Sequence, residues 1–175
     1  MSLPYDMLAT PTNWGHTDMP FEWPHPEFRF RSSRDWEQVP GDDPTRLQLY
    51  CPETRTTITL SMDPYKVPPE KFEATARFLL ETRKKAYVDG VRHLLGQDAR
   101  IELSYTNERV QSHSTGTGWE ISYEGMGSGR SFFGFLGYVT SRKIVNLFVE
   151  TPLSFTPGRR EMYQEVIGGF EVTLP

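Results

Sequence analysis

Apolar and polar residues alternate along much of the chain after residue 27, and this pattern predicts short β-strands. The alternation is cleanest in residues 57–62, where Ile58, Leu60 and Met62 face one way and three hydroxyl side chains face the other. Residues 28–31 and 46–50 alternate in the same manner, with turn-forming residues between them. Strands with one apolar and one polar face are typical of antiparallel sheets that bury one surface.

The period changes within residues 69–90, where apolar residues recur at helical spacing. Pro69 or Glu70 opens this predicted helix, and Gly90 is its expected C-terminal stop. Acidic residues in the first turn and basic residues near the end match the helix dipole. A second, shorter helix is predicted over residues 156–168, because a threonine and a proline begin it and two glycines end it.

Further strands are predicted on the C-terminal side of the long helix. They cover residues 101–105, 110–114, 119–124, 131–139 and 143–149, with a turn at 106–108 and a terminal strand or extended tail at 170–174. Residues 131–139 and 143–149 are apolar on both faces. This indicates central strands covered on both sides, or strands whose second face awaits a ligand. The element order predicts an α+β fold, with a mostly antiparallel sheet of about six to eight strands, one long helix and one short helix.

The composition adds a distinct N-terminal segment to this picture. The 175 residues are 37% apolar and 24% charged, which fits one globular domain. The formal net charge of −4 comes from the first 27 residues, which hold four acidic residues and no lysine or arginine. We expect residues 1–27 to form an acidic arm rich in proline and aromatic residues, followed by one domain over residues 28–175. The arm residues expected to contact the domain or a partner are Trp14, Phe21 and Trp23.

Several classes of protein are disfavoured by the same composition. No apolar run approaches the ~18 residues of a membrane-spanning helix, and the start lacks the basic and apolar regions of a secretory signal. We therefore expect a cytoplasmic protein without membrane insertion. The negative net charge argues against a nucleic-acid partner. The single cysteine, Cys51, excludes an internal disulfide and is expected to be a half-buried, inert thiol.

Metal-ligating and catalytic motifs are missing from the sequence. The four histidines include no pair at the i, i+4 spacing of a helical metal site; they are His16, His25, His93 and His113. The glycine-rich runs at residues 116–118 and 125–129 lie between strands, so they predict hairpin turns and no phosphate-binding loop. We therefore predict no catalytic residue, no metal and no cofactor.

The remaining candidate for a binding site is apolar. Phe132, Leu136 and Tyr138 point one way from their predicted strand, whereas Phe133, Phe135 and Val139 point the other way. If the long helix covers one face, the other face requires the short helix, the arm or a partner. All of these residues fit a packed core, and they also fit a groove for an apolar segment. The candidate groove residues are Phe132, Leu136 and Tyr138, together with Phe133 and Phe135.

The order and placement of these elements resemble the PsbP-like superfamily, which includes the Ran-binding Mog proteins and many bacterial domains. The resemblance runs over most of residues 28–175. It rests on the opening strand with Trp36 after its turn, the short strands to Met62, the helix near 70–89, the meander through Trp119 and Phe148, and the closing helix before Gly169 and Phe170. It looks strongest to the small bacterial branch that includes chaperones of type VI secretion effectors. The resemblance implies a PsbP-like sandwich.

Together, the pattern and the resemblance suggest a non-catalytic protein-binding domain. In its concrete form it is a cytoplasmic chaperone or adaptor that shields an apolar or transmembrane segment of a secretion effector, and a homodimer would deepen its groove. The alternative is a small-ligand carrier or a small enzyme that uses the same sheet with polar residues such as His113, Glu120 and Arg142. A weaker alternative is a GTPase-binding adaptor like the Mog proteins.

Overall fold

The computed structural model describes residues 21–25, 27–127, 131–152 and 159–173. Its elements are β1 (Phe21–Pro24), β2 (Phe28–Ser32), β3 (Glu37–Val39), β4 (Arg46–Cys51), β5 (Thr56–Asp63), the 3-10 turn η1 (Pro69–Lys71), α1 (Phe72–Leu95), β6 (Ser104–Ser112), β7 (Gly118–Met126), β8 (Phe132–Thr140), β9 (Ile144–Thr151), α2 (Arg159–Gly169) and β10 (Phe170–Val172). The predicted α+β class, with one long and one short helix, is confirmed. The described part of the chain contains more strands than expected, because the sequence pattern predicts neither β1 nor β3, which are four and three residues long.

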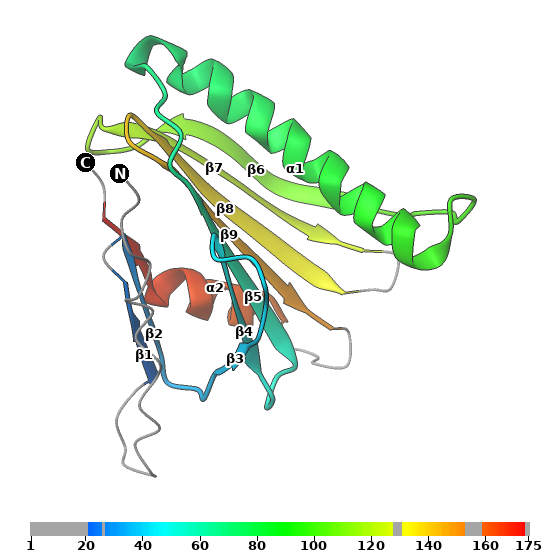
Figure 1. Cartoon of the computed structure of the whole chain (residues 1–175). Helices are drawn as coiled ribbons and strands as arrows, with labels where there is room; N and C mark the ends of the chain where they lie inside the picture. Colours follow the sequence, from blue (N-terminus) through cyan, green and yellow to red (C-terminus); the bar gives the residue numbers. More distant parts are fainter. Residues whose placement is uncertain (1–20, 26, 128–130, 153–158, 174–175) are drawn as a thin grey trace.

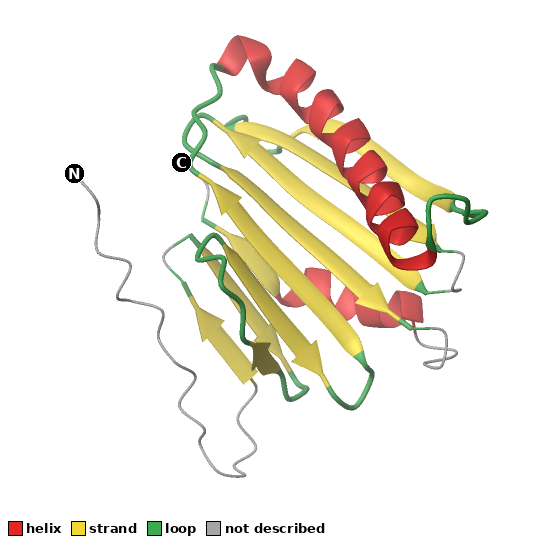
Figure 2. Cartoon of the chain, turned by 45° about the vertical axis from the view of Figure 1, so that its right-hand side comes forward, coloured by secondary structure: helices red, strands yellow, loops and turns green. Residues whose placement is uncertain are grey.

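The strands form two antiparallel sheets. The large sheet has the order β3-β4-β5-β9-β8-β7-β6, and the small sheet has the order β1-β2-β10. Helix α1 runs diagonally over one face of the large sheet, against β6, β7 and β8 (Figure 1). Helix α2 lies on the opposite face, against β8, β9 and the small sheet (Figure 2). The large sheet is therefore the middle layer of the molecule.

Two hydrophobic cores lie on the two faces of the large sheet. The first joins β4, β5, β8 and β9 to α2 and the small sheet, and the second joins β7, β8 and β9 to α1. Strand β8 contributes to both, with Phe132 and Leu136 in the first core and Phe133, Phe135 and Val139 in the second. The pattern of two apolar faces in residues 131–139 thus belongs to a central strand covered on both sides.

The α1 side of the large sheet is only partly covered. Seven strands about 4.8 Å apart make a sheet roughly 29 Å wide, whereas a helix with its side chains is about 10–12 Å across. Helix α1 contacts β6, β7 and β8 and leaves the same face of β4 and β5 open. On β5 this face carries the hydroxyls of Thr57, Thr59 and Ser61, while Ile58 and Leu60 are buried on the other face. The prediction that residues 57–62 form a strand with one apolar and one hydroxyl-bearing face is confirmed.

Helix α1 continues beyond its predicted end. Gly90 lies inside the helix, which ends at Leu95 and is followed by Gly96. Gly96 has a φ of 99°, a conformation that favours glycine, and its N–H donates to the Arg92 carbonyl at 2.9 Å. An internal glycine weakens a helix by about 1 kcal/mol without ending it, so Gly90 was the wrong stop.

The turn predicted at residues 106–108 is instead a bulge inside strand β6. The register with β7 shifts between Thr106 and Arg109, and Asn107 has a φ of 54°. Asparagine tolerates this left-handed conformation, so the chain absorbs extra residues while continuing along the same edge strand. The Asn107 amide also donates to Glu124 on β7 at 3.1 Å. The two strands expected here are therefore one.

Part of the expected N-terminal arm joins the small sheet. Phe21–Pro24 forms β1 and pairs with β2, and the Phe21 ring lies 6.1 Å from the ring of Phe30. Pro24 is tolerated because β1 is an edge strand. Trp14 lies outside the described residues, and Trp23 is described only by its place in β1.

A buried ion pair ties both ends of the described chain to the β8–β9 hairpin. Lys143 is only 4% exposed, and its ammonium group binds the Glu27 carboxylate and donates to the Thr173 carbonyl at 2.6 Å. Arg142 also donates to Glu27, at 3.2 Å. The Thr173 N–H donates in turn to the Glu27 carbonyl at 2.9 Å. The pair therefore joins segments that lie more than 100 residues apart in the sequence.

We predict that Gly134→Ala destabilises the protein by about 2 kcal/mol, because the new methyl group would overlap the ring of Tyr163. That ring is buried, and its hydroxyl donates to the Phe135 carbonyl at 3.3 Å, so it cannot move freely. Gly168→Ala is the matched control, since nothing lies near its added methyl group, and it should stabilise α2 by about 0.5 kcal/mol. Urea unfolding measures both, and equal effects would contradict the prediction.

We also predict that Glu27→Ala destabilises the protein by about 2 kcal/mol, because it leaves the buried Lys143 ammonium without its carboxylate. In the background of Lys143→Met the same change should cost much less. A double-mutant cycle of unfolding free energies should give a coupling of about 1 kcal/mol or more. Additive effects would show that the pair does not stabilise the fold.

Candidate binding cleft

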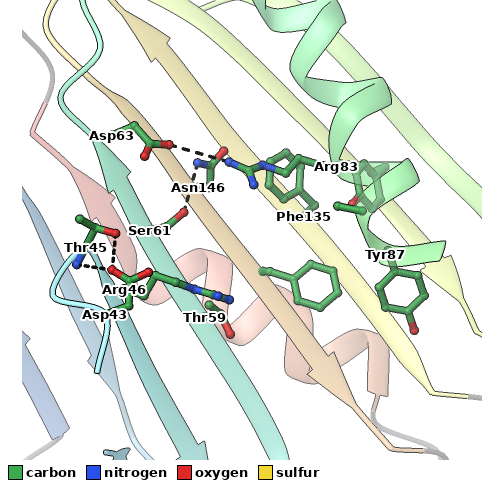
Figure 3. A pocket seen from close by; sticks show the side chains of 13 residues that line it. Asp43, Thr45, Arg46, Thr59, Ser61, Asp63, Arg83, Tyr87, Phe135 and Asn146 are labelled. Atoms are coloured by element: carbon green, nitrogen blue, oxygen red, sulfur yellow. Dashed lines mark hydrogen bonds and ion pairs between the residues drawn. The ribbon is translucent and has the colours of Figure 1, made fainter. Parts of the chain in front are cut away.

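A cleft of about 490 Å³ lies where α1 leaves the large sheet uncovered (Figure 3). It is bounded by α1 on one side and by the loop before β4 on the other, and its floor is the α1-side face of the large sheet. Its lining residues are Asp43, Thr45, Arg46, Thr59, Ser61, Asp63, Arg83, Ala86, Tyr87, Tyr123, Phe135, Asn146 and Phe148. We call this site the cleft.

Strand register assembles the floor of the cleft in rows across the sheet. In one row, Arg46 of β4 is opposite Ser61 of β5, and Ser61 is opposite Asn146 of β9. In the next row, Thr59 is opposite Phe148, which is itself opposite Phe135 of β8. The floor therefore changes from hydroxyl groups on β5 to aromatic rings on β8 and β9, because the apolar residues lie towards α1.

The α1 wall is made by residues spaced three and four positions apart on one helix face. Arg83, Ala86 and Tyr87 line the cleft, and the Arg83 guanidinium reaches across β9 to within 3.9 Å of the Asp63 carboxylate (Figure 3). The Tyr87 ring packs 5.7 Å from the ring of Phe148. One helix turn thus supplies both a cation and an aromatic surface.

Two buried polar atoms at the cleft have no hydrogen-bond partner within the described residues. Asn146 is 4% exposed; its amide nitrogen donates to the Ser61 hydroxyl at 3.2 Å, but its Oδ1 accepts no bond. The Nε–H of Arg83 likewise has no acceptor. An unpaired buried donor or acceptor typically costs about 1–3 kcal/mol. Both atoms belong to residues that line the cleft.

Asp43, at the outer wall, is engaged in its own turn. Its carboxylate accepts hydrogen bonds from the Thr45 hydroxyl at 2.6 Å and from the Thr45 N–H at 2.9 Å. These bonds, helped by the nearby charge of Arg46, lower the pKa of Asp43 below its usual value. Asp43 is thereby held ionised as a structural cap, whereas the exposed Arg46 side chain faces the cleft.

A half-buried carboxyl group lies one row beyond the cleft floor. Glu150 is opposite Thr57, and it lies on the same face of β9 as Asn146 and Phe148. Burial raises the pKa of Glu150, although a hydrogen bond from the Tyr87 hydroxyl partly opposes the shift. Burial also raises the pKa of Tyr87.

The apolar groove expected from the sequence is closed by the chain itself. Phe132 and Leu136 are 7% and 5% exposed beneath α2, and Phe133 and Phe135 are buried beneath α1. The expectation of an open groove over these residues is therefore corrected, because a helix covers each face of β8. Phe135 alone of the five lines the cleft. Tyr138 is partly buried against the first core, and burial raises its pKa to about 12.

Of the other candidate polar residues, His113 and Glu120 both lie beside Tyr138: the His113 ring is 5.9 Å from the Tyr138 ring, and Glu120 is opposite Tyr138 in the register of β7 and β8. Arg142 binds Glu27, whereas His113 bonds Thr115 in the β6–β7 turn. The Nδ1 atom of His25 accepts the N–H of Glu27, and the His25 ring stacks on Phe28. No cluster of three or more metal-ligating side chains occurs in the described ranges.

Cys51 is fully buried in the first core, whereas the sequence predicts a half-buried thiol. Neither described helix is both long and apolar enough to cross a membrane.

Sequence reasoning missed the polar residues of the cleft. The hydroxyl face of residues 57–62 was visible, but it was interpreted only as the wet side of a strand. Nothing in the sequence placed Arg83 of α1 beside Asn146 of β9, which are 63 positions apart. An asparagine inside an otherwise apolar strand was the one available signal, because a buried amide requires partners.

We predict that Glu150→Gln raises the melting temperature more at about pH 7.5 than near pH 4. The raised pKa means that the folded state binds the Glu150 proton more tightly than the unfolded state, so stability is lost as the pH rises above the ordinary glutamate pKa. Glutamine is neutral and still accepts the Tyr87 hydrogen bond. Thermal unfolding at the two pH values measures the effect, and an equal change at both would contradict it.

Comparison with known proteins relates the fold to solved structures. No protein-family model and no curated protein matches the sequence. The solution structure of cyanobacterial PsbP (CyanoP) from Synechocystis sp. PCC 6803 has a TM-score of 0.66 and 11% identity, over 94% of this chain and 99% of that one. A protein from Bacteroides thetaiotaomicron VPI-5482 has a TM-score of only 0.37 at 15% identity, over 83% of this chain and 45% of its own. The first similarity shows that this chain has a PsbP-like fold.

Proposed function

We propose that the chain is a non-catalytic binding protein and that the cleft takes a segment of another protein. The observation that carries the proposal is the pair of unpartnered atoms, Asn146 Oδ1 and Arg83 Nε, beside an aromatic surface. A polypeptide backbone provides both the N–H and the C=O groups that would satisfy such atoms. Binding would therefore remove a cost that the free protein carries.

The shape of the exposed floor favours an extended segment. Same-face residues on a strand are about 6.7 Å apart, so the floor rows from Asp63 through Thr59 span roughly 13 Å. This length accommodates about four residues of extended chain. Because hydroxyl groups line one side of the floor and aromatic rings the other, the favoured segment carries both polar and apolar side chains.

A non-catalytic role agrees with the state of the carboxylates. Asp43 is hydrogen-bonded within its own turn, and Asp63 faces the Arg83 guanidinium. Glu150 has a raised pKa, but it lies one row beyond the lining of the cleft. A general base must lie within hydrogen-bond reach of the proton it removes. This arrangement suits binding better than acid–base chemistry.

The resemblance supplies a more specific form of the proposal. In that form the protein is a cytoplasmic chaperone or adaptor whose partner is an apolar segment of a secretion effector, acting alone or as a homodimer. The PsbP-like fold is compatible with this role but is equally compatible with a GTPase-binding adaptor, since function resides in sites more than in folds.

Site-specific photo-crosslinking tests the proposal. The photoreactive residue p-benzoylphenylalanine replaces either Ala86, an exposed residue lining the cleft, or Ala74, an exposed residue on α1 that is not among the cleft's lining residues. We expect a polypeptide adduct in the native host at position 86 and little at position 74. The adduct at 86 should be lost with Asn146→Leu, which keeps the side-chain volume but removes the acceptor.

The control is the folded state of each variant, checked by circular dichroism before crosslinking. Equal adduct yields at positions 86 and 74, from folded variants, would show that the cleft is not the binding surface.

A small-ligand carrier is the second candidate, because a volume of about 490 Å³ falls within the range of small-molecule pockets, roughly 300–1,000 Å³. Native mass spectrometry of the chain purified from its host distinguishes a small-ligand carrier from a protein that binds a polypeptide segment. A retained small molecule, lost with Asn146→Leu, would favour this candidate over a protein segment.

A further inference from the structure

We infer that the cleft recognises a carboxylate attached to an apolar or aromatic group, as at the free C-terminal end of a polypeptide. This inference rests on the proposed function, since it names the chemistry of the ligand that the cleft would take. It is carried by three features of the cleft: a guanidinium with an unused donor, a buried acceptor beside it, and aromatic rings on the neighbouring strands.

The guanidinium of Arg83 is poised for a carboxylate. Its Nε–H is buried and has no acceptor among the described residues, and its contact with Asp63 is long, at 3.9 Å. Guanidinium donors are arranged as a planar fork that matches two carboxylate oxygens. The Asp63 side chain is 51% exposed, so water can solvate its carboxylate when a ligand carboxylate takes its place beside the Arg83 guanidinium. Arg46 lies on the opposite wall of the cleft and adds positive charge.

The acceptor on the floor selects for a donor next to that carboxylate. The Asn146 amide is fixed by its bond to Ser61, and its free Oδ1 lies between Asp63 and the Arg83 guanidinium in Figure 3. At the end of a polypeptide, the last backbone N–H lies close to the terminal carboxylate. Both atoms could then be satisfied by one residue of the ligand.

The aromatic side of the floor provides the apolar contact. The rings of Phe135 and Phe148 line the cleft on β8 and β9, and Tyr87 projects from α1 beside them. An apolar or aromatic side chain on the terminal residue would pack there and would be removed from water. Recognition therefore requires the carboxylate and the apolar group together.

The experiment compares N-acetylphenylalanine with N-acetylphenylalaninamide on the full chain labelled with ¹⁵N. These probes share every group except the carboxylate. We expect the acid to bind with a Kd of about 1 mM, as suits a ligand of this size, and the amide to bind roughly tenfold more weakly. The acid should shift the NMR signals of the Arg83 Nε–H and of the Asn146 side chain.

Three variants at two arginines provide the matched controls. Arg83→Gln should abolish the preference for the acid, and Arg83→Lys should not restore it, because lysine lacks the planar fork. Arg46→Gln, on the opposite wall, should weaken binding by less than about threefold. Each variant is compared with the unmodified chain by circular dichroism, and the acid–amide comparison on the unmodified chain stands even if a variant fails to fold.

Two hexapeptides ending in phenylalanine, one with a free and one with an amidated C-terminus, distinguish the sources of the carboxylate. Tighter binding of the free peptide than of N-acetylphenylalanine supports a polypeptide end, and equal binding supports a small carboxylic acid. Equal affinity for acid and amide, or shifts confined to residues outside the cleft, would overturn the inference. In that case an adduct specific to position 86 would still uphold the proposed function, whereas its absence would remove both.

Discussion

The mismatch in width between one helix and a seven-stranded sheet determines where this protein has a free surface. Helix α1 covers β6, β7 and β8 and buries their aromatic residues, but it cannot extend over β4 and β5. The uncovered strip carries threonine and serine, which water solvates at little cost. The cleft is the junction between the covered and uncovered halves, so it combines aromatic rings and hydroxyl groups in one place.

On the opposite face, a second layer covers the middle of the large sheet. There α2 and the small sheet bury Phe132, Leu136 and their neighbours on β4, β5 and β9. The close approach of α2 to β8 depends on Gly134, which has no side chain and so leaves room for the ring of Tyr163. The buried pair of Lys143 and Glu27 then fastens the chain ends across this layer. Phe132 and Leu136 of β8 are therefore buried on this face.

The unpaired atoms of the cleft are best understood in the same terms. Most buried polar groups in proteins have hydrogen-bond partners, so exceptions require an explanation. Of the four buried side-chain polar atoms without partners in the described residues, two, those of Asn146 and Arg83, lie in the cleft. Both side chains lie at the boundary between the half of the sheet that α1 covers and the half that it leaves open. At this boundary the protein has packed groups on the α1 side only, so these two polar atoms lack a partner from the open side.

The sequence by itself determined the α+β class, the face that each residue of β5 and β8 presents, and the long helix, because periods of 2 and 3.6 residues depend only on local backbone geometry. The sequence misplaced the end of α1 and divided β6 into two strands. A glycine does not end a helix, and a polar triplet does not end a strand, when packing against the rest of the fold holds the element together. Tertiary structure alone decided that α2 covers the face of β8 that carries Phe132 and Leu136, and that Arg83 and Asn146 line one cleft. Those outcomes depend on which elements pack together, and hydrophobic periodicity is the same for a face covered by a helix and for one left to a ligand.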